Sequence, residues 1–185
     1  MTYHLELPGL TRELPICPVN DTLSIGAFVL FGDVELTEKC ADELCRLAPE
    51  HDVMITAESK GIPLVYAMAR KMRENRYILA RKAPKLYMRD VIRYDVRSIT
   101  TDAQQSLYLD GYDAEYMKGR RVLIVDDVIS TGESLHALEE LVRRAGGEIV
   151  GRMAVLAEGD AAHREDIITL APLPLFHPDG TPIEG

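Results

Sequence analysis

The stretch Val122–Ser134 constrains the fold of this chain more than any other part of the sequence. It opens with four apolar residues, three of them β-branched, which predicts a short strand buried on both faces. Two carboxylates, Asp126 and Asp127, close this predicted strand, and a turn rich in hydroxyl groups follows. Apolar residues then recur at helical spacing up to Gly146-Gly147, where we expect the helix to end.

The turn Ser130–Ser134 has the chemistry of a phosphate site. The first N–H groups of a helix lack partners and lie at the positive end of its dipole. Gly132 lets a ligand approach the backbone, and Ser130, Thr131 and Ser134 can each donate an O–H. Carboxylates just before such a turn suit groups that a phosphorylated sugar also carries, namely ribose hydroxyls or a bound Mg²⁺. The stretch therefore predicts a sugar-phosphate site.

Strands that end in one or two acids also occur in receiver domains, Rossmann domains and phosphatases. Those classes explain Asp126-Asp127, but none of them requires Ser-Thr-Gly-x-Ser three residues later. The chain has neither a Walker glycine-lysine loop nor a Gly-x-Gly-x-x-Gly motif. The whole stretch thus favours the sugar-phosphate interpretation.

Composition narrows the class of protein. With 185 residues, 46% of them hydrophobic and 28% charged, the chain suits one globular domain with a small appendage. A net charge of -9 argues against a nucleic-acid-binding surface. No apolar run approaches the roughly 18 residues of a membrane span, and the first residues lack the pattern of a signal peptide, so we expect a cytoplasmic protein. The three cysteines and five histidines show no spacing typical of a metal site.

Strand and helix patterns alternate along most of the chain. Strands are expected at 52–57, 77–80, 122–125 and 149–157, and a final pair at 167–170 and 173–176. This alternation predicts an α/β fold with a parallel sheet and helices on both faces. Because ligands bind beyond the carboxyl ends of such strands, we expect the polar turns Glu58–Gly61, Arg81-Lys82 and Asp126–Ser134 to meet at one edge.

The remaining segments complete the predicted organisation. Residues 1–27 form an N-terminal arm or hood, 28–176 the core, and 177–185 a tail. Thr37 is expected to cap a helix over 38–48, and a helix over 62–72 turns Ile62, Val65, Ala69 and Met72 inward. Two short strands around a long polar loop are expected between residues 82 and 119, with a lid over about 95–118.

The motif Asp126–Ser134 resembles the 5-phosphoribosyl-1-pyrophosphate (PRPP) signature of type I phosphoribosyltransferases, and residues 26–176 resemble the adenine members of that family. Phe31-Gly32-Asp33 is similar to their Phe-Arg-Asp at the purine pocket, and Ala57–Gly61 to their pyrophosphate loop. Arg81–Leu86 is similar to their Arg-Lys-x-x-Lys-Leu segment. The resemblance implies a hood and a flexible lid loop around a parallel sheet.

The same resemblance implies the reaction and its residues. Ribose 5-phosphate would pass from PRPP to a purine, adenine first, with release of pyrophosphate. The PRPP-binding residues would be Asp126, Asp127, Ser130, Thr131, Gly132, Glu133 and Ser134. The pyrophosphate-binding residues would be Glu58, Ser59, Lys60, Gly61, Lys82 and Lys85, and Phe31 would bind the base. Mg²⁺ would enter with PRPP, with Asp126 as the one candidate contact, and a homodimer is expected.

Several positions depart from the family pattern. Gly32 and Lys60 replace arginines, and Lys60 keeps the charge while losing the bidentate fork. Tyr108 occupies the position of the catalytic glutamate of the lid, and Asp110 is the nearest acid. The candidate catalytic residues are therefore Asp127, Lys82 and Asp110.

Two alternatives remain open. The base could be a 6-oxopurine or orotate, although 6-oxopurine enzymes carry an aspartate where Ser130 stands and a lysine where Gly159 stands. The chain could also be a non-catalytic PRPP-binding regulator, since Tyr108 leaves the acid role unfilled.

Overall fold

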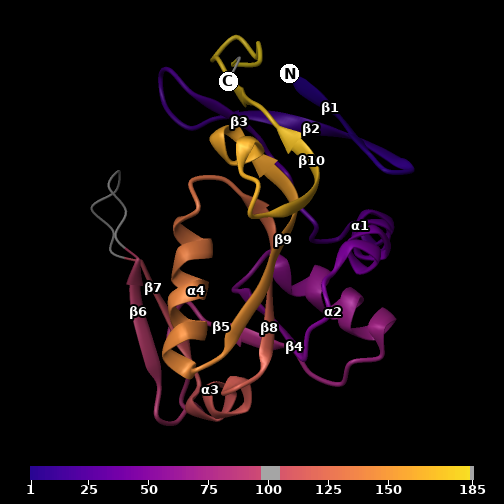
Figure 1. Ribbon diagram of the computed structural model, residues 1–185. Coiled ribbons are helices and arrows are strands. Elements are labelled where there is room, and N and C mark those ends of the chain that lie inside the picture. Colours follow the sequence, from indigo (N-terminus) through magenta and orange to yellow (C-terminus); the bar gives the residue numbers. More distant parts are fainter. Residues whose placement is uncertain (97–104, 184–185) are drawn as a thin grey trace.

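The computed structural model describes residues 1–96 and 105–183, and a five-stranded parallel sheet lies at its centre (Figure 1). The strand order is β10-β9-β8-β4-β5. The bounds are β4 Val53–Ala57, β5 Ile78–Ala80, β8 Arg121–Ile129, β9 Glu148–Glu158 and β10 Ile168–Leu173. The predicted parallel sheet is confirmed, and β8 is its middle strand, between β9 and β4.

Strand β8 shows why its apolar run is continuous. Val122 and Ile124 belong to the hydrophobic cluster on one face of the sheet, whereas Leu123 and Val125 belong to the cluster on the other. All four are fully buried. The prediction that the acids close this strand is wrong, because the ladder with β9 continues from Asp126 as far as Ile129.

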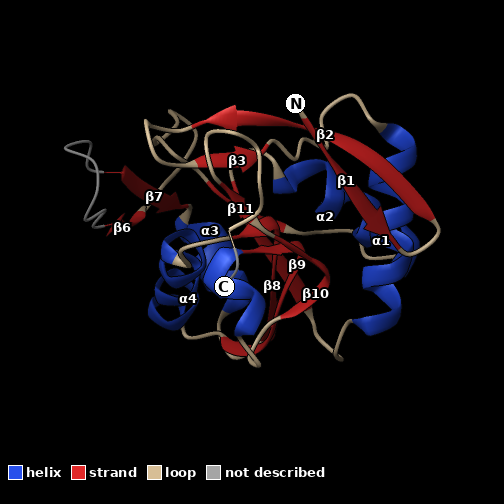
Figure 2. Ribbon diagram, turned by 90° about the horizontal axis from the view of Figure 1, so that it is seen from above, coloured by secondary structure: helices blue, strands red, loops and turns tan. Residues whose placement is uncertain are grey.

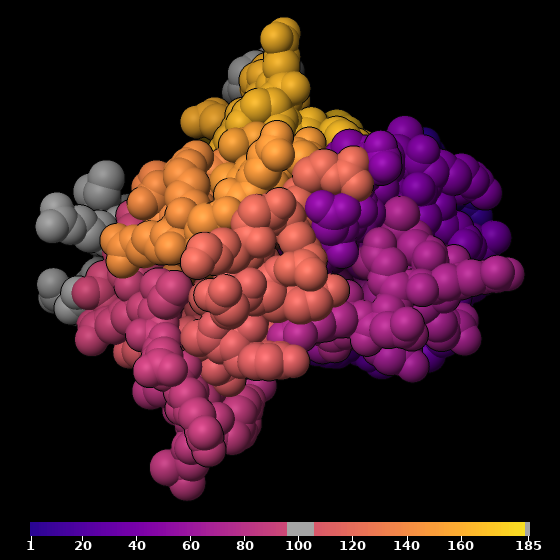
Figure 3. Space-filling model, turned by 60° about the horizontal axis from the view of Figure 1, so that its bottom comes forward, coloured from indigo at the N-terminus to yellow at the C-terminus, as the bar shows by residue number. Residues whose placement is uncertain are grey.

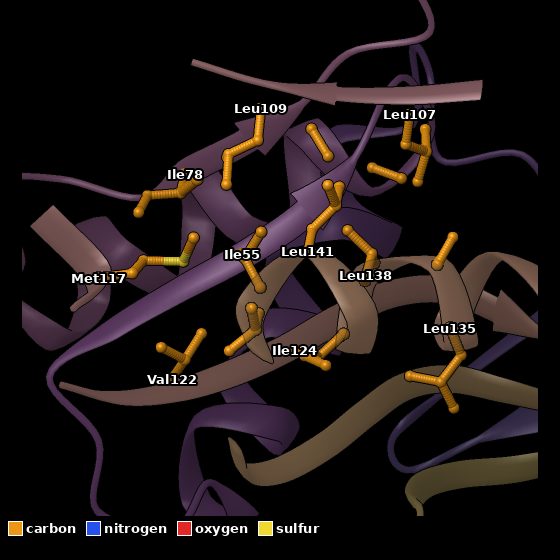
Figure 4. Packing of buried hydrophobic residues seen from close by; sticks show 14 of the residues in the cluster. Ile55, Ile78, Leu107, Leu109, Met117, Val122, Ile124, Leu135, Leu138 and Leu141 are labelled. Atoms are coloured by element: carbon orange, nitrogen blue, oxygen red, sulfur yellow. The ribbon is translucent and has the colours of Figure 1, made fainter. Parts of the chain in front are cut away.

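Helices cover both faces of the sheet, as predicted (Figures 1 and 2). On one face lie α1, Val34–Leu47, and α2, Gly61–Met72. On the other lie α3, Gly111–Met117, and α4, Glu133–Ala145. Leu135, Leu138 and Leu141 of α4 pack against Val122 and Ile124 (Figure 4). None of the helices in the described ranges is long and apolar enough to cross a bilayer.

Two helix predictions were wrong in detail. Asp33, not Thr37, caps α1, because the Asp33 carboxylate accepts the Leu36 N–H at 2.9 Å. Thr37 lies inside the first turn, and its hydroxyl donates to the Asp33 carbonyl at 2.8 Å. In α2 the predicted Val65 and Ala69 are buried, but Leu64 and Met68 fill the core where Ile62 and Met72 were expected.

A smaller antiparallel sheet sits above the core and contains both ends of the described chain (Figure 1). Its order is β1-β2-β3-β11, with β1 Thr2–Leu7, β2 Leu10–Pro18, β3 Ser24–Gly26 and β11 Leu175–Phe176. The register places Phe176 opposite Ser24, and the Phe176 ring is fully buried. The division at residues 27 and 176 stays a prediction.

The segment between Lys82 and Gly119 contains the two expected strands, β6 Ile92–Val96 and β7 Gln105–Leu109, paired antiparallel. Of the predicted lid over 95–118, residues 97–104 lie outside the described residues, and 105–117 form β7 and α3. The short helix η1, Gly159–His163, follows β9.

Leu138 offers a test of the packing on the α4 face. It is fully buried, so replacement by alanine should lower the free energy of unfolding by about 2–5 kcal/mol. His136→Ala in the same helix is the control, because this side chain is 59% exposed and should change stability by less than about 0.5 kcal/mol. Both are measured by denaturant unfolding, and an equal effect of the two changes would contradict the packing described.

Candidate active site

A cavity of about 490 Å³ lies where the carboxyl ends of β4, β5 and β8 meet. The three polar turns expected from the sequence contribute to it together. The lining residues are Ala57, Glu58, Ser59, Lys60, Lys82, Ser106, Leu107, Tyr108, Asp126, Asp127, Val128 and Ser134. Parallel pairing of β4 with both neighbours puts these turns at the same edge of the sheet, which explains the convergence.

Glu58 connects the turns after β4 and β5. Its backbone N–H donates to the Ala80 carbonyl at 2.9 Å, and its carboxylate accepts the Lys82 N–H at 3.0 Å. The same carboxylate lies 3.3 Å from Arg81 Nε. The side chain of Glu58 therefore holds the two turns together, and the Glu58-Ser59 peptide bond is cis.

Gly61 lets α2 begin directly against β8. A Cβ atom at this position would lie 2.1 Å from Thr56 Oγ1 and 3.3 Å from Asp126 Oδ1. No residue with a side chain fits there without displacing the fully buried Thr56. Gly61 in this way keeps the turn 58–61, which resembles the pyrophosphate loop of the family, close to the acidic pair.

The acidic pair forms one side of the cavity. Asp127 is buried, with 7% of its surface exposed, and its backbone N–H donates to Asp126 Oδ1 at 2.9 Å. Within the described ranges Asp127 Oδ2 has no hydrogen-bond partner, and Lys60 Nζ lies 3.9 Å away. Burial first, and then the charge of Asp127, raise the pKa of Asp126 well above its ordinary value. The buried Asp127 Oδ2, without a partner in the described ranges, is suited to accept a hydrogen bond from a hydroxyl group or to bind a cation.

The turn before α4 is open to solvent. Gly132 has φ +81°, a left-handed conformation that favours glycine, and α4 begins at the next residue. Thr131 and Ser134 are exposed, and Ser134 also lines the cavity. The start of a 13-residue helix, where the first N–H groups lack partners within the helix, thus lies beside the acidic pair.

Not every predicted site residue lines this cavity. Gly61 and the turn residues Ser130–Glu133 adjoin residues that do, whereas Phe31, Lys85 and Asp110 make other contacts. Phe31 is half-exposed and lines a second cavity of about 280 Å³ with Pro63 and Tyr66 of α2. Lys85 is not among the lining residues, and its backbone N–H donates to the sulfur of Met88. Asp110 caps α3 by accepting the Tyr112 N–H at 3.1 Å, so the structure gives no support to a role as the acid of the lid.

Other residues of the cavity were missed. Ser106 and Leu107 line it because β7 lies next to β5, where the backbones of Arg81 and Tyr108 exchange two hydrogen bonds of 2.8 Å. Tyr108, singled out above as a departure, lines it as well. The resemblance to the family places Ser106-Leu107-Tyr108 in the lid, but the pairing of this segment with Arg81 joins distant parts of the chain and has no local sequence pattern.

Comparison with known proteins identifies the family. Residues 35–170 match the phosphoribosyl transferase domain family. The adenine phosphoribosyltransferase of Thermotoga maritima is 31% identical over 158 residues, covering 84% of this chain and 87% of that protein. The hypoxanthine/guanine phosphoribosyltransferase of Methanococcus voltae is 32% identical over 147 residues, covering 76% and 71%. This chain belongs to the phosphoribosyltransferase family, and the predicted resemblance is confirmed.

Solved structures show the same fold. The adenine phosphoribosyltransferase of Thermoanaerobacter pseudethanolicus superposes with a TM-score of 0.66 at 22% identity, covering 76% of this chain and 82% of that one. The enzyme of Saccharomyces cerevisiae, complexed with an imino-altritol bisphosphate and adenine, has a TM-score of 0.64 at 19% identity and covers 92% of both chains. The predicted α/β fold class is confirmed.

The raised pKa of Asp126 predicts how stability depends on pH. The folded chain binds the proton of Asp126 more tightly than the unfolded chain does. Asp126 therefore lowers the free energy of unfolding as the pH rises above 3.8, the ordinary pKa of an aspartate. An asparagine at this position would not ionise, and its side-chain oxygen could still accept the Asp127 N–H. We expect Asp126→Asn to be more stable at pH 7, on the order of 1 kcal/mol, with the gain vanishing towards pH ~3.

Asp52 supplies a control of opposite sign. Its hydrogen bonds with Arg121 lower its pKa to about 2. Asp52 therefore stabilises the fold when the pH is above its ordinary pKa of 3.8, and this stability is lost as the pH falls towards 2. Asp52→Asn should therefore be less stable at pH 7. Both variants are followed by urea unfolding between pH 3 and 8, and loss of stability in Asp126→Asn at pH 7 would contradict the assignment.

Proposed function

We propose that this chain is a purine phosphoribosyltransferase of purine salvage, a pentosyltransferase that moves ribose 5-phosphate from PRPP to a purine nitrogen and releases pyrophosphate. The observation that carries the proposal is the buried Asp127 carboxylate, one oxygen of which has no partner among the described residues. It lies in one cavity with Lys60, Lys82 and the turn that starts α4. Membership of the family supports the same reaction.

Each part of PRPP has a matching part of the site. The turn Ser130–Ser134, with its hydroxyl groups and its place at the start of α4, suits the 5′-phosphate. Asp126 and Asp127 suit the ribose hydroxyls, which can donate to Asp127 Oδ2. The backbone of 58–61, with Lys60 and Lys82, suits the pyrophosphate on the other side of the cavity.

The reaction breaks the bond between C1′ and pyrophosphate and forms a bond between C1′ and a purine nitrogen. Negative charge grows on the leaving pyrophosphate, where the two lysine side chains neutralise it. Positive charge grows on the ribose ring, where the acidic pair stabilises it. The turns that carry these groups are held in place by Glu58, which binds the Lys82 backbone N–H, and by the ladder of β8 with β9.

A magnesium ion carried by PRPP fits this site. Carboxylate oxygens are ligands that Mg²⁺ prefers, and Asp127 Oδ2 is a buried carboxylate oxygen without a partner in the part of the chain that is described. Asp126 and Asp127 are the residues that would hold the ion. When bound, it would neutralise charge on the diphosphate of PRPP.

Adenine is the base that we favour. The adenine enzyme of Thermotoga maritima is similar to this chain over most of both proteins. A 6-oxopurine is the second candidate, because the hypoxanthine/guanine enzyme of Methanococcus voltae is equally similar over a shorter stretch. A non-catalytic PRPP-binding protein is the third, because the cavity presents Tyr108 where the resemblance to the family implies a lid acid.

A turnover assay separates these three candidates. Pyrophosphate release is measured with PRPP and adenine, hypoxanthine, guanine, xanthine or orotate, with Mg²⁺ and after its removal by a chelator. We expect release with adenine and Mg²⁺. Asp127→Asn should lower kcat/KM for PRPP about 100-fold or more, since the buried pair loses a charge that the transition state needs, while the fold is retained.

The outcomes decide between the candidates as follows. Release with hypoxanthine or guanine alone would select the 6-oxopurine activity. PRPP binding without release for any base would select the non-catalytic protein. Unchanged kinetics of Asp127→Asn would refute the role given to the acidic pair. Asp113→Asn is the matched control, because Asp113 lies on α3 and pairs with Arg76 outside the cavity.

We also propose that the chain forms a homodimer through the segment between β5 and β6. This segment projects from the face shown in Figure 3, and its Leu86 and Tyr87 are exposed. Apolar side chains on a projecting segment favour burial against a partner. Sedimentation should give the mass of two chains, and Leu86→Glu combined with Tyr87→Glu should give the mass of one. A monomer before mutation would refute the dimer.

A further inference from the structure

The residue that follows η1 reaches the turn before α4. A Cβ atom placed on Gly132 would lie 2.9 Å from Arg164 Nη1, closer than Cβ atoms approach other atoms in proteins. The guanidinium of Arg164 therefore occupies the space that a side chain at position 132 would fill. Arg164 is 32 positions from Gly132 along the sequence, so it is brought there by the fold, at the end of β9 beside β8.

Asp166 fixes the orientation of this guanidinium. Arg164 Nε donates to Asp166 Oδ1 at 2.9 Å, and Nη2 donates to Oδ2 at 2.7 Å. This bidentate pair holds one edge of the planar group. Nη1 has no acceptor among residues 1–96 and 105–183, and it is the atom that faces the turn. The side chain is 34% exposed, so a ligand on the turn could reach it.

The turn itself is short of positive charge. Ser130–Ser134 offers neutral donors and the end of a helix dipole, but it also contains the acidic Glu133, and two carboxylates precede it on β8. The lysines that line the cavity belong to the turns after β4 and β5. A phosphate dianion on this turn would gain from a further cation, and a guanidinium with a free N–H is the donor that phosphates bind best.

We propose that Arg164 binds the 5′-phosphate of the sugar substrate, together with the turn Ser130–Ser134. This rests on the proposed function, which assigns the 5′-phosphate to that turn. Arg164 acts on the phosphate end alone, so it supports the binding of any phosphorylated ribose, whichever base follows. Gly132 then has two reasons to be glycine, its positive φ and the room that it leaves for Arg164.

The test compares two ligands that report the two ends of the site. Binding of ribose 5-phosphate and of pyrophosphate to the full chain is measured by calorimetry for Arg164→Gln and Arg164→Lys. Arg164→Gln should bind ribose 5-phosphate about tenfold more weakly, the usual effect of losing a charged hydrogen bond. Arg164→Lys should lose less, because the charge remains. Pyrophosphate affinity should stay unchanged in both.

Arg143→Gln is the matched control. Arg143 lies in the last turn of α4, far along the helix from its start, and pairs with Glu140 at 2.7 Å. The same change of charge there should leave both affinities unaltered. Ribose 5-phosphate binding by Arg164→Gln at the level of the unmodified chain would overturn the role of Arg164 and leave the proposed function intact. An equal loss of pyrophosphate affinity in Arg164→Gln would also overturn the role of Arg164, since the substitution would then have distorted the whole site. No binding of ribose 5-phosphate by the unmodified chain would overturn both.

Discussion

The site depends on two adjacent carboxylates held near the end of the central strand, Asp127 buried and Asp126 half-buried. Burying one such group beside another is unfavourable, and the raised pKa of Asp126 reflects that cost. The ladder between β8 and β9 provides the constraint, because pairing continues through Asp126 to Ile129 and fixes where both side chains point. A buried charge that lacks a partner is then available for a substrate, as is common where proteins sacrifice stability for chemistry.

The rest of the cavity is assembled around that pair by short polar contacts. Glu58 joins two turns with one carboxylate, and Gly61 lets α2 approach β8. Arg164 reaches the turn before α4 from the far side of the sheet order, beyond β9. These contacts come from separate elements, so the cavity exists before any substrate arrives, which is what electrostatic stabilisation of a transition state requires.

Much of this could be predicted from local patterns. The strand at 122–125 could be predicted because burial on both faces requires a continuous apolar run. The end of α4 could be predicted because a glycine, here Gly146, commonly caps the C-terminus of a helix. The C-terminal end of β8 could not be predicted, because pairing with β9 continues through the polar residues Asp126 and Asp127. In α2 the apolar residues permit two inward faces, and only packing against the sheet selects Leu64 and Met68. The positions of Tyr108 and Arg164 depend on contacts between distant segments, which no periodicity encodes.

The pairing of β11 with β3 has a consequence for how the molecule comes to exist. The small sheet takes three strands from residues 2–26 and its fourth from residues 175–176, so its last pairing joins segments 150 positions apart, Ile25 with Leu175. Contacts this distant in sequence form slowly, because a long loop must close first. On this ground we expect the burial of Phe176 against β3 to be a late step of folding, after the strands of the central sheet have paired.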